Sequence, residues 1–183
     1  MNDVPLVIVG VATCNNIHTI DHTIDMLIGQ TRPPDRIIFC DNSSDGTHHK
    51  IQEYQGCDEA PPIEIIDQSG DGVADAYDHI LDQAEGYDIF ATIQTELQVD
   101  SEWLEGHIRL HDKYPDIDMV MGDHKTNVPT DKQVSPDERP YYSGRNFSAK
   151  SGALEGVDGW DSHFLRGADW AMRIRLAGAG TRV

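Results

Sequence analysis

Short apolar runs alternate with segments whose apolar residues recur at helical spacing over the first two thirds of the chain. Runs typical of buried strands occupy Val4–Val11, Arg36–Asp41, Ile63–Asp67, Asp88–Ile93 and Asp118–Gly122. The segments between them predict helices around 17–28, 47–54, 73–84 and 101–113. Such alternation is typical of βαβ units, so we predict an α/β fold with a mostly parallel central sheet flanked by helices.

The pattern changes in the C-terminal part of the chain. Lys125 to Lys150 shows no period and contains three prolines, so we expect an irregular segment that is either a functional loop or disordered. A last amphipathic helix is predicted over Ala168–Leu176. With 183 residues, the chain is expected to form one domain over 1–183.

Membrane insertion and export are not expected. No apolar run approaches the roughly 20 residues that a membrane-spanning helix needs. The N-terminus carries Asp3 where a signal peptide would carry Lys or Arg, so we expect a cytoplasmic protein.

The chain is strongly acidic, with 14 Lys and Arg residues against 32 Asp and Glu and a net charge of −18. This charge repels phosphate backbones and anionic lipids, which argues against unaided binding of nucleic acid or a membrane surface. The acidity comes from 23 Asp and 9 Glu, with only 5 Lys. A surface of this kind suits molar salt, where charge repulsion is screened, so we expect a halophilic archaeal source. The alternative is a protein that is simply acidic.

The cysteines and paired histidines give weak metal signals. The chain has three cysteines, Cys14, Cys40 and Cys57. Cys14 and Cys40 adjoin apolar runs, so we expect buried, reduced thiols rather than disulfides or metal ligands. His18 and His22 are four residues apart, as are His107 and His111. The first pair falls on the polar face of its predicted helix, and we expect neither pair to bind metal.

Polar clusters follow three of the predicted strands, at 13–16, 41–45 and 94–96. Open α/β sheets bind ligands beyond the carboxyl ends of their strands. Taken singly, each cluster also fits a turn or a helix cap. Together they favour a nucleotide site, in which Asp41 could accept hydrogen bonds from a uracil N–H or from ribose hydroxyls.

The sequence from VIVGVATCNN to GQTRPPDRIIFCDNSSDGT resembles the opening of family-2 glycosyltransferases, which have the GT-A fold. The resemblance continues through 72–76, 100–104 and 159–169, and so extends over most of the chain. It implies a GT-A-type, Rossmann-like sandwich with a nucleotide-binding half at 1–100 and an acceptor half at 101–183. This acceptor half is either truncated at its C-terminus or that of a minimal member. The implied activity moves a sugar from a nucleoside-diphosphate donor, UDP- or GDP-linked, to a hydroxyl of a glycan or lipid-linked acceptor, with inversion.

The resemblance also assigns residues. Thr13, Asn15 and Asp41 would line the nucleoside pocket, as would Thr95, while Asp71 and Gly72 would close over the base. Asp169 matches the general base of the family, which takes a proton from the acceptor hydroxyl. The alternative for Asp169 is an acid in the first turn of a helix, where it would stabilise the helix N-terminus.

Three positions depart from the family pattern. The metal-binding Asp-x-Asp is replaced by Gln94, Thr95 and Glu96, which leaves Glu96 as the one carboxylate for Mn²⁺ or Mg²⁺. We therefore expect weak metal binding that depends on bound nucleotide. The family's Arg-Asn pair is Tyr77-Asp78, and the acid before Asp169 is Ala168. These departures support the alternative of a GT-A-fold protein that binds a nucleotide without turnover.

Overall fold

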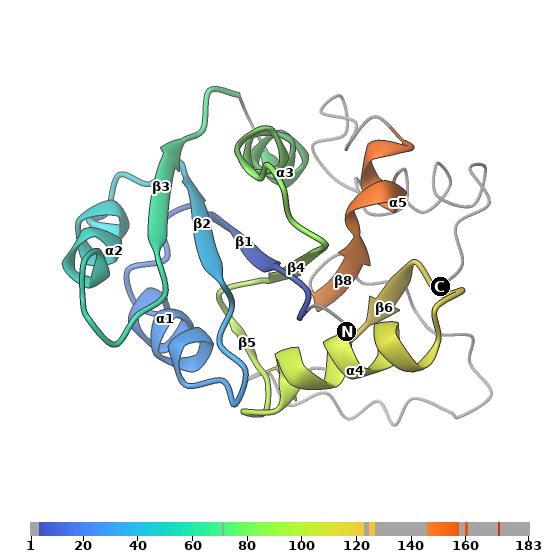
Figure 1. Cartoon of the computed structure of the whole chain (residues 1–183). Helices are drawn as coiled ribbons and strands as arrows, with labels where there is room; N and C mark the ends of the chain where they lie inside the picture. Colours follow the sequence, from blue (N-terminus) through green and yellow to red (C-terminus); the bar gives the residue numbers. More distant parts are fainter. Residues whose placement is uncertain are drawn as a thin grey trace.

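The computed structural model describes residues 4–70, 72–122, 125–126 and 146–157, together with Trp160 and Met172. A central sheet lies between two layers of helices (Figure 1). The strands are β1 (Val7–Thr13), β2 (Arg36–Asp41), β3 (Ile63–Asp67), β4 (Ile89–Ile93), β5 (Leu97–Gln98), β6 (Met119–Met121), β7 (Lys125–Thr126) and β8 (Asn146–Lys150). The helices are α1 (Ile20–Ile28), α2 (Thr47–Tyr54), α3 (Gly72–Gln83), α4 (Trp103–Lys113) and α5 (Ser151–Glu155).

The central sheet has six strands in the order β3-β2-β1-β4-β8-β6. Strands β1 to β4 are parallel to one another, and β8 is antiparallel to both β4 and β6. Strand β6 therefore runs in the same direction as β4, and the carboxyl ends of all five parallel strands lie at one edge. The predicted α/β class, with a mostly parallel sheet flanked by helices, is confirmed.

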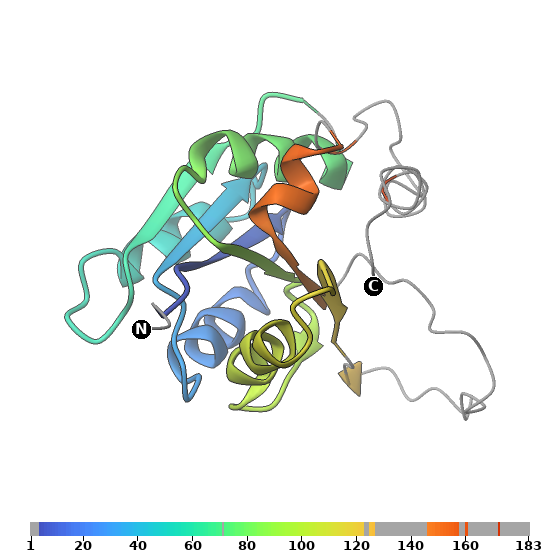
Figure 2. The ribbon, with the colours of Figure 1, turned by 45° about the vertical axis from the view of Figure 1, so that its right-hand side comes forward.

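The two faces of the sheet bury separate apolar clusters. Helices α1, α2 and α4 cover one face, where Val9 and Phe39 pack against Ile24 and Leu104. Helices α3 and α5 cover the other face (Figure 2), where Phe90 is fully buried in the second cluster. At Gly10 a Cβ atom would lie 2.7 Å from the Phe90 ring, so only glycine allows this packing. Among the described residues, no helix has the length and apolar character needed to cross a bilayer.

The first strand differs from its predicted bounds of Val4–Val11. Val4 is 77% exposed and Leu6 is 41% exposed, so the apolar run begins outside the sheet. The strand continues instead to Thr13, which pairs with Asp41 of β2. Pairing with the neighbouring strand therefore sets this boundary, and hydrophobicity does not.

The prediction that Lys125–Lys150 is irregular throughout was wrong for two segments. Strand β8 inserts between β4 and β6, and the short β7 pairs with β5. Phe147 and Ala149 of β8 face an apolar core, whereas Asn146 and Ser148 are fully buried on the opposite face. The sequence predicted no strand here because polar residues occupy two of its buried positions. In the folded chain these residues have buried partners on α4. Of the helix predicted at 168–176, only Met172 falls within the described residues.

The expectation that Cys14 is buried was also wrong. Cys14 is exposed, because it lies in the loop beyond β1, whereas Cys40 is buried within β2. All three cysteines are free, and burial raises the pKa of the Cys40 thiol to about 12. His107 and His111 of α4 are each 5% exposed, and both lie within hydrogen-bond distance of Ser148 in β8.

Candidate nucleotide site

A pocket of about 340 Å³ opens at the carboxyl edge of the sheet. The loops that follow β1, β2, β3 and β4 all contribute to it, as expected for the ligand crevice of an α/β sheet. Its lining brings together Thr13, Gly72, Thr95 and Glu96 of the predicted site residues. The other lining residues are Ala12, Cys14, Asn16, Asn42, Gln68, Val73 and Gln94. Asp71 and Asp169 lie outside the described residues.

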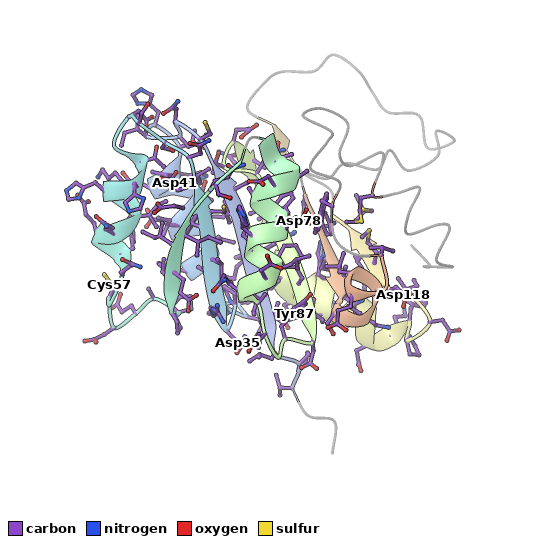
Figure 3. The ribbon with its side chains drawn as sticks, turned by 90° about the horizontal axis from the view of Figure 1, so that it is seen from above. Asp35, Asp41, Cys57, Asp78, Tyr87 and Asp118 are labelled. Atoms are coloured by element: carbon purple, nitrogen blue, oxygen red, sulfur yellow. The ribbon has the colours of Figure 1, made fainter. Side chains whose placement is uncertain are left out.

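Asp41 lies behind the wall of this pocket and is only 5% exposed. Its Oδ1 accepts hydrogen bonds from Thr13 Oγ1 at 2.7 Å and from Ser43 Oγ at 2.6 Å. Asp41 is labelled in Figure 3, and its Oδ2 is 3.3 Å from Nδ1 of His48, on the first turn of α2. Because Thr13 donates its hydrogen to Asp41, its hydroxyl oxygen offers only lone pairs to the pocket.

Asn15 connects the loops after β1 and β2. Its backbone is left-handed, with φ of +56°, a conformation that asparagine tolerates better than most residues. Its backbone N–H donates a hydrogen bond to Ser43 Oγ at 2.8 Å, and its side-chain Oδ1 accepts one from the backbone N–H of Ser44 at 2.9 Å. The exposed side chain of Asn15 is thus used to hold the neighbouring loop.

Asp45 received no role from the sequence, although it belongs to the motif quoted above. Its carboxylate accepts hydrogen bonds from the Thr47 hydroxyl at 2.6 Å, the Thr47 N–H and the Ile17 N–H. The bond from the Thr47 hydroxyl is the main cause that lowers the pKa of Asp45. Asp45 therefore joins the start of α2 to the loop after β1, and its position just before a predicted helix was the available signal.

Gln68 is a further pocket residue that sequence reasoning missed. Its Nε2 donates to the Gly72 carbonyl at 2.6 Å, and its backbone N–H donates to the Asp41 carbonyl at 3.1 Å. This bond fixes the side-chain amide, and Oε1, which accepts hydrogen bonds as a carbonyl oxygen, has no partner among the described residues. The signal for Gln68 was its place directly after the third predicted strand.

The segment after β4 supplies the candidate metal ligand. Thr95 is 2% exposed, its carbonyl accepts from Thr23 Oγ1 at 2.9 Å, and its hydroxyl donates to Glu96 Oε2 at 3.3 Å. Within the described residues, no three His, Cys, Asp or Glu side chains are grouped as a protein-only metal site requires. The Glu96 carboxylate and the Gln94 amide are oxygen donors of the kind that Mg²⁺ and Mn²⁺ accept. They fit such an ion only if other oxygens, such as those of a diphosphate, complete its coordination.

Comparison with known proteins assigns the fold and the family. The sequence model of Glycosyl transferase family 2 matches residues 8–176. The chain belongs to Glycosyl transferase family 2. No curated protein matches the chain.

Solved structures share the fold of this family-2 chain. A mannosyltransferase from Pyrobaculum calidifontis, in complex with GDP-Man and Mn²⁺, superposes with a TM-score of 0.79 at 19% identity, over 99% of this chain and 54% of that one. TarS from S. aureus in complex with UDP-GlcNAc gives 0.73 at 16% identity, over 93% and 52%. Glucosyl-3-phosphoglycerate synthase from Mycobacterium tuberculosis, with Mn²⁺ and UDP-glucose, gives 0.67 at 15% identity, over 97% and 68%. The chain thus spans about half the length of the first two.

In this family-2 chain, the residues that replace the Arg-Asn pair have structural partners. Tyr77 is 2% exposed, its hydroxyl is 3.0 Å from Thr92 Oγ1, and burial raises its pKa to about 12. Its ring lies 5.0 Å from the ring of Trp160. Asp78, labelled on α3 in Figure 3, accepts a hydrogen bond from the Trp160 N–H at 2.6 Å. The pair therefore holds the chain at Trp160 against α3.

Proposed function

We propose that this protein transfers a sugar from a UDP- or GDP-linked donor to an acceptor hydroxyl, as in glycan or polysaccharide assembly. The observation that carries the proposal is the pocket at the carboxyl edge of the sheet, where Thr13, Gln68 and Glu96 meet in a family-2 chain. Residues 1–183 act in this proposal as one unit, with the donor bound by 1–100 and the acceptor by 101–183. The Asp-rich composition supports, as part of this proposal, a source in the salt-rich cytoplasm of a halophilic archaeon.

Two groups of the pocket would select the base. Both can accept a hydrogen bond, because Gln68 Oε1 is a carbonyl oxygen and the Thr13 hydroxyl donates its own hydrogen to Asp41. Uracil carries an N–H at position 3 and guanine carries one at position 1, whereas cytosine and adenine have a bare nitrogen at the equivalent place. When an acceptor atom of the pocket faces the bare nitrogen of a base, neither atom has a hydrogen-bond partner, which costs about 1–3 kcal/mol of binding free energy. The pocket therefore favours UDP and GDP over CDP and ADP.

A divalent cation would be held by Glu96, assisted by the Gln94 amide oxygen and the donor's own phosphates. When bound, it would offset the negative charge that builds on the departing diphosphate. Thr95 contributes by fixing the carboxylate, since its hydroxyl donates to Glu96 Oε2. With one protein carboxylate, the ion should bind weakly in the absence of nucleotide.

The chemical step follows from a single displacement. Asp169, as general base, takes the proton from the acceptor hydroxyl while that oxygen forms a bond to C1 of the sugar. The bond between C1 and the diphosphate oxygen breaks, and the electron pair leaves with the nucleoside diphosphate. Because attack comes from the side opposite the leaving group, the anomeric configuration inverts.

A second candidate function is nucleotide binding without turnover, and Gln94 favours it because an amide supplies no charge to the metal. Calorimetric titration with UDP, GDP, CDP and ADP, with and without Mn²⁺ in molar KCl, tests the binding that both candidates share. We expect binding of UDP or GDP that weakens at least fivefold in Gln68→Leu and is unchanged in Gln52→Leu, an exposed residue on α2. Equal affinity for all four nucleotides would contradict the base selection. Release of UDP or GDP from a nucleotide sugar, lost in Asp169→Asn, separates the enzyme from the binding protein.

A further inference from the structure

A second cavity, of about 690 Å³, lies between helix α4 and the end of strand β6. Figure 2 shows α4 beside the edge strand β6, and α4 lies on the face of the sheet that α1 also covers. The cavity is lined by the chain from 99 to 102, by α4 and by Val120 to Gly122. We propose that it is a saccharide subsite that holds the acceptor, which rests on the glycosyl transfer proposed above.

A buried imidazole contributes the main polar atom of this cavity. His107 is 5% exposed, and its Nδ1 is 2.7 Å from Ser148 Oγ in the sheet. His107 also lines the cavity, and its second ring nitrogen, Nε2, has no hydrogen-bond partner within the described residues. A nitrogen left unpaired in this way is stabilised when a ligand supplies a hydrogen bond.

The protonation of His107 decides which ligands suit it. Burial and the neighbouring His111 lower the pKa of His107 to about 4, so the ring is neutral near pH 7. In a neutral imidazole each nitrogen is either a donor or an acceptor, never both. A hydroxyl group serves either case because it donates and accepts. Sugar hydroxyls therefore satisfy His107 Nε2 whichever tautomer Ser148 selects.

An aromatic wall and an open helix position accompany the imidazole. Trp103 is 7% exposed, and its Nε1 donates to Asn146 Oδ1 at 2.7 Å, which fixes the ring at 5.3 Å from that of His107. Gly106 lies in the middle of α4, where glycine costs about 1 kcal/mol relative to alanine. A Cβ there would have no neighbour within 4 Å, so packing does not require glycine. Its missing side chain instead leaves cavity volume free.

The charges around the cavity argue for an uncharged ligand. Asp100 and Glu102 lie at the rim with Arg109, all three exposed, in a chain of net charge −18. This excess of negative charge disfavours a phosphate or a second nucleotide. A neutral saccharide has no such penalty. The cavity thus has the apolar walls and the few fixed polar groups that are typical of ligand sites.

The cavity is close to the donor pocket. Strands β4 and β6 run in the same direction, so their carboxyl ends share one edge of the sheet. The donor pocket ends at Glu96 and the cavity begins at Val99, which is three residues further along the chain. Three residues span at most roughly 10 Å. A saccharide in the cavity would thus extend toward the sugar of the donor.

Saturation-transfer NMR of the full chain in molar KCl tests the subsite. The probes are glucose, galactose, mannose and N-acetylglucosamine, together with the β1,4- and α1,4-linked disaccharides of glucose. We expect transfer from the wild type to at least one probe. Gly106→Leu, which fills the cavity and favours the helix, should weaken that binding at least tenfold. His107→Asn, which keeps a polar atom near Ser148 but removes Nε2, should weaken it about threefold or more.

The matched control is Gly152→Leu, because Gly152 on α5 also has open space at its Cβ and lies outside the cavity. It should bind the probe as the wild type does. UDP and GDP affinity, measured on the same samples, should not change in Gly106→Leu. If nucleotides bind but no probe does, or if Gly106→Leu binds the probe equally well, the subsite is refuted. If no nucleotide binds to the wild type, the proposed function fails, whatever the saccharides do.

Discussion

Mild acid should destabilise this protein through His107. Burial first, and His111 second, lower the pKa of His107 from an ordinary 6.5 to about 4 in the folded chain. On unfolding, the ring regains its ordinary affinity for a proton. The unfolded state therefore binds one more proton than the folded state between pH 4 and 6.5, and the free energy of unfolding falls as the pH is lowered through this window. Above pH 6.5 the contribution of His107 is fully present.

The magnitude follows from the two pKa values. A shift from 6.5 to about 4 corresponds to a total loss of about 3 kcal/mol once the pH is below 4. About 2 kcal/mol of this loss falls between pH 7.5 and pH 5, where carboxyl groups with ordinary pKa values are still ionised. For a domain whose total stability is about 5–15 kcal/mol, such a loss is easily measured.

The assay is urea unfolding, followed by circular dichroism at several pH values from 7.5 to 5 in constant KCl. His107→Asn removes the titrating ring but keeps a polar atom near Ser148 Oγ. Between pH 7.5 and pH 5, its free energy of unfolding should therefore fall by about 2 kcal/mol less than that of the wild type. His49→Asn is the matched control, because the His49 side chain on α2 is 79% exposed. A wild type and a His107→Asn variant with the same pH dependence would refute the reasoning.

Three other perturbations test the site and the composition. Asp41→Ala should weaken UDP or GDP binding by about 1.5–3 kcal/mol in calorimetry, because it removes the charged group that orients the Thr13 hydroxyl, and unchanged affinity would remove Asp41 from the nucleotide site. Mn²⁺ should bind weakly to the nucleotide-free protein and measurably when UDP or GDP is present. Gln94→Asp should tighten Mn²⁺ binding several-fold, because it adds a second carboxylate. Tight Mn²⁺ binding to the nucleotide-free wild type would mean that the metal site is elsewhere. The melting temperature should rise steeply from dilute buffer to molar KCl if the acidity reflects salt adaptation, and equal stability in both would leave the acidity with another cause.

Much of the fold could be read from the sequence because its signals are local. The predicted bounds of β2, α2 and β3 agree with the structure, since each element is an apolar or periodic run with polar residues at its ends. Strand β8 escaped prediction because its buried positions include Asn146 and Ser148. Their partners on α4 lie 37 to 43 residues away in the sequence, so only the folded chain shows that these polar groups are satisfied.

The candidate site divides in the same way. The sequence by itself placed polar residues after β1, β2 and β4, and the family motif pointed to Thr13, Asp41 and Glu96. It could not show that Asp41 lies behind Thr13 or that Gln68 is held beside Asp41, because both facts depend on hydrogen bonds between the ends of different strands. Local sequence determined which segments become strands and helices, since hydrophobic period and turn chemistry act within a few residues. The tertiary structure alone decided which polar atoms face one another, because that depends on strand order and register, which bring distant residues to one edge of the sheet.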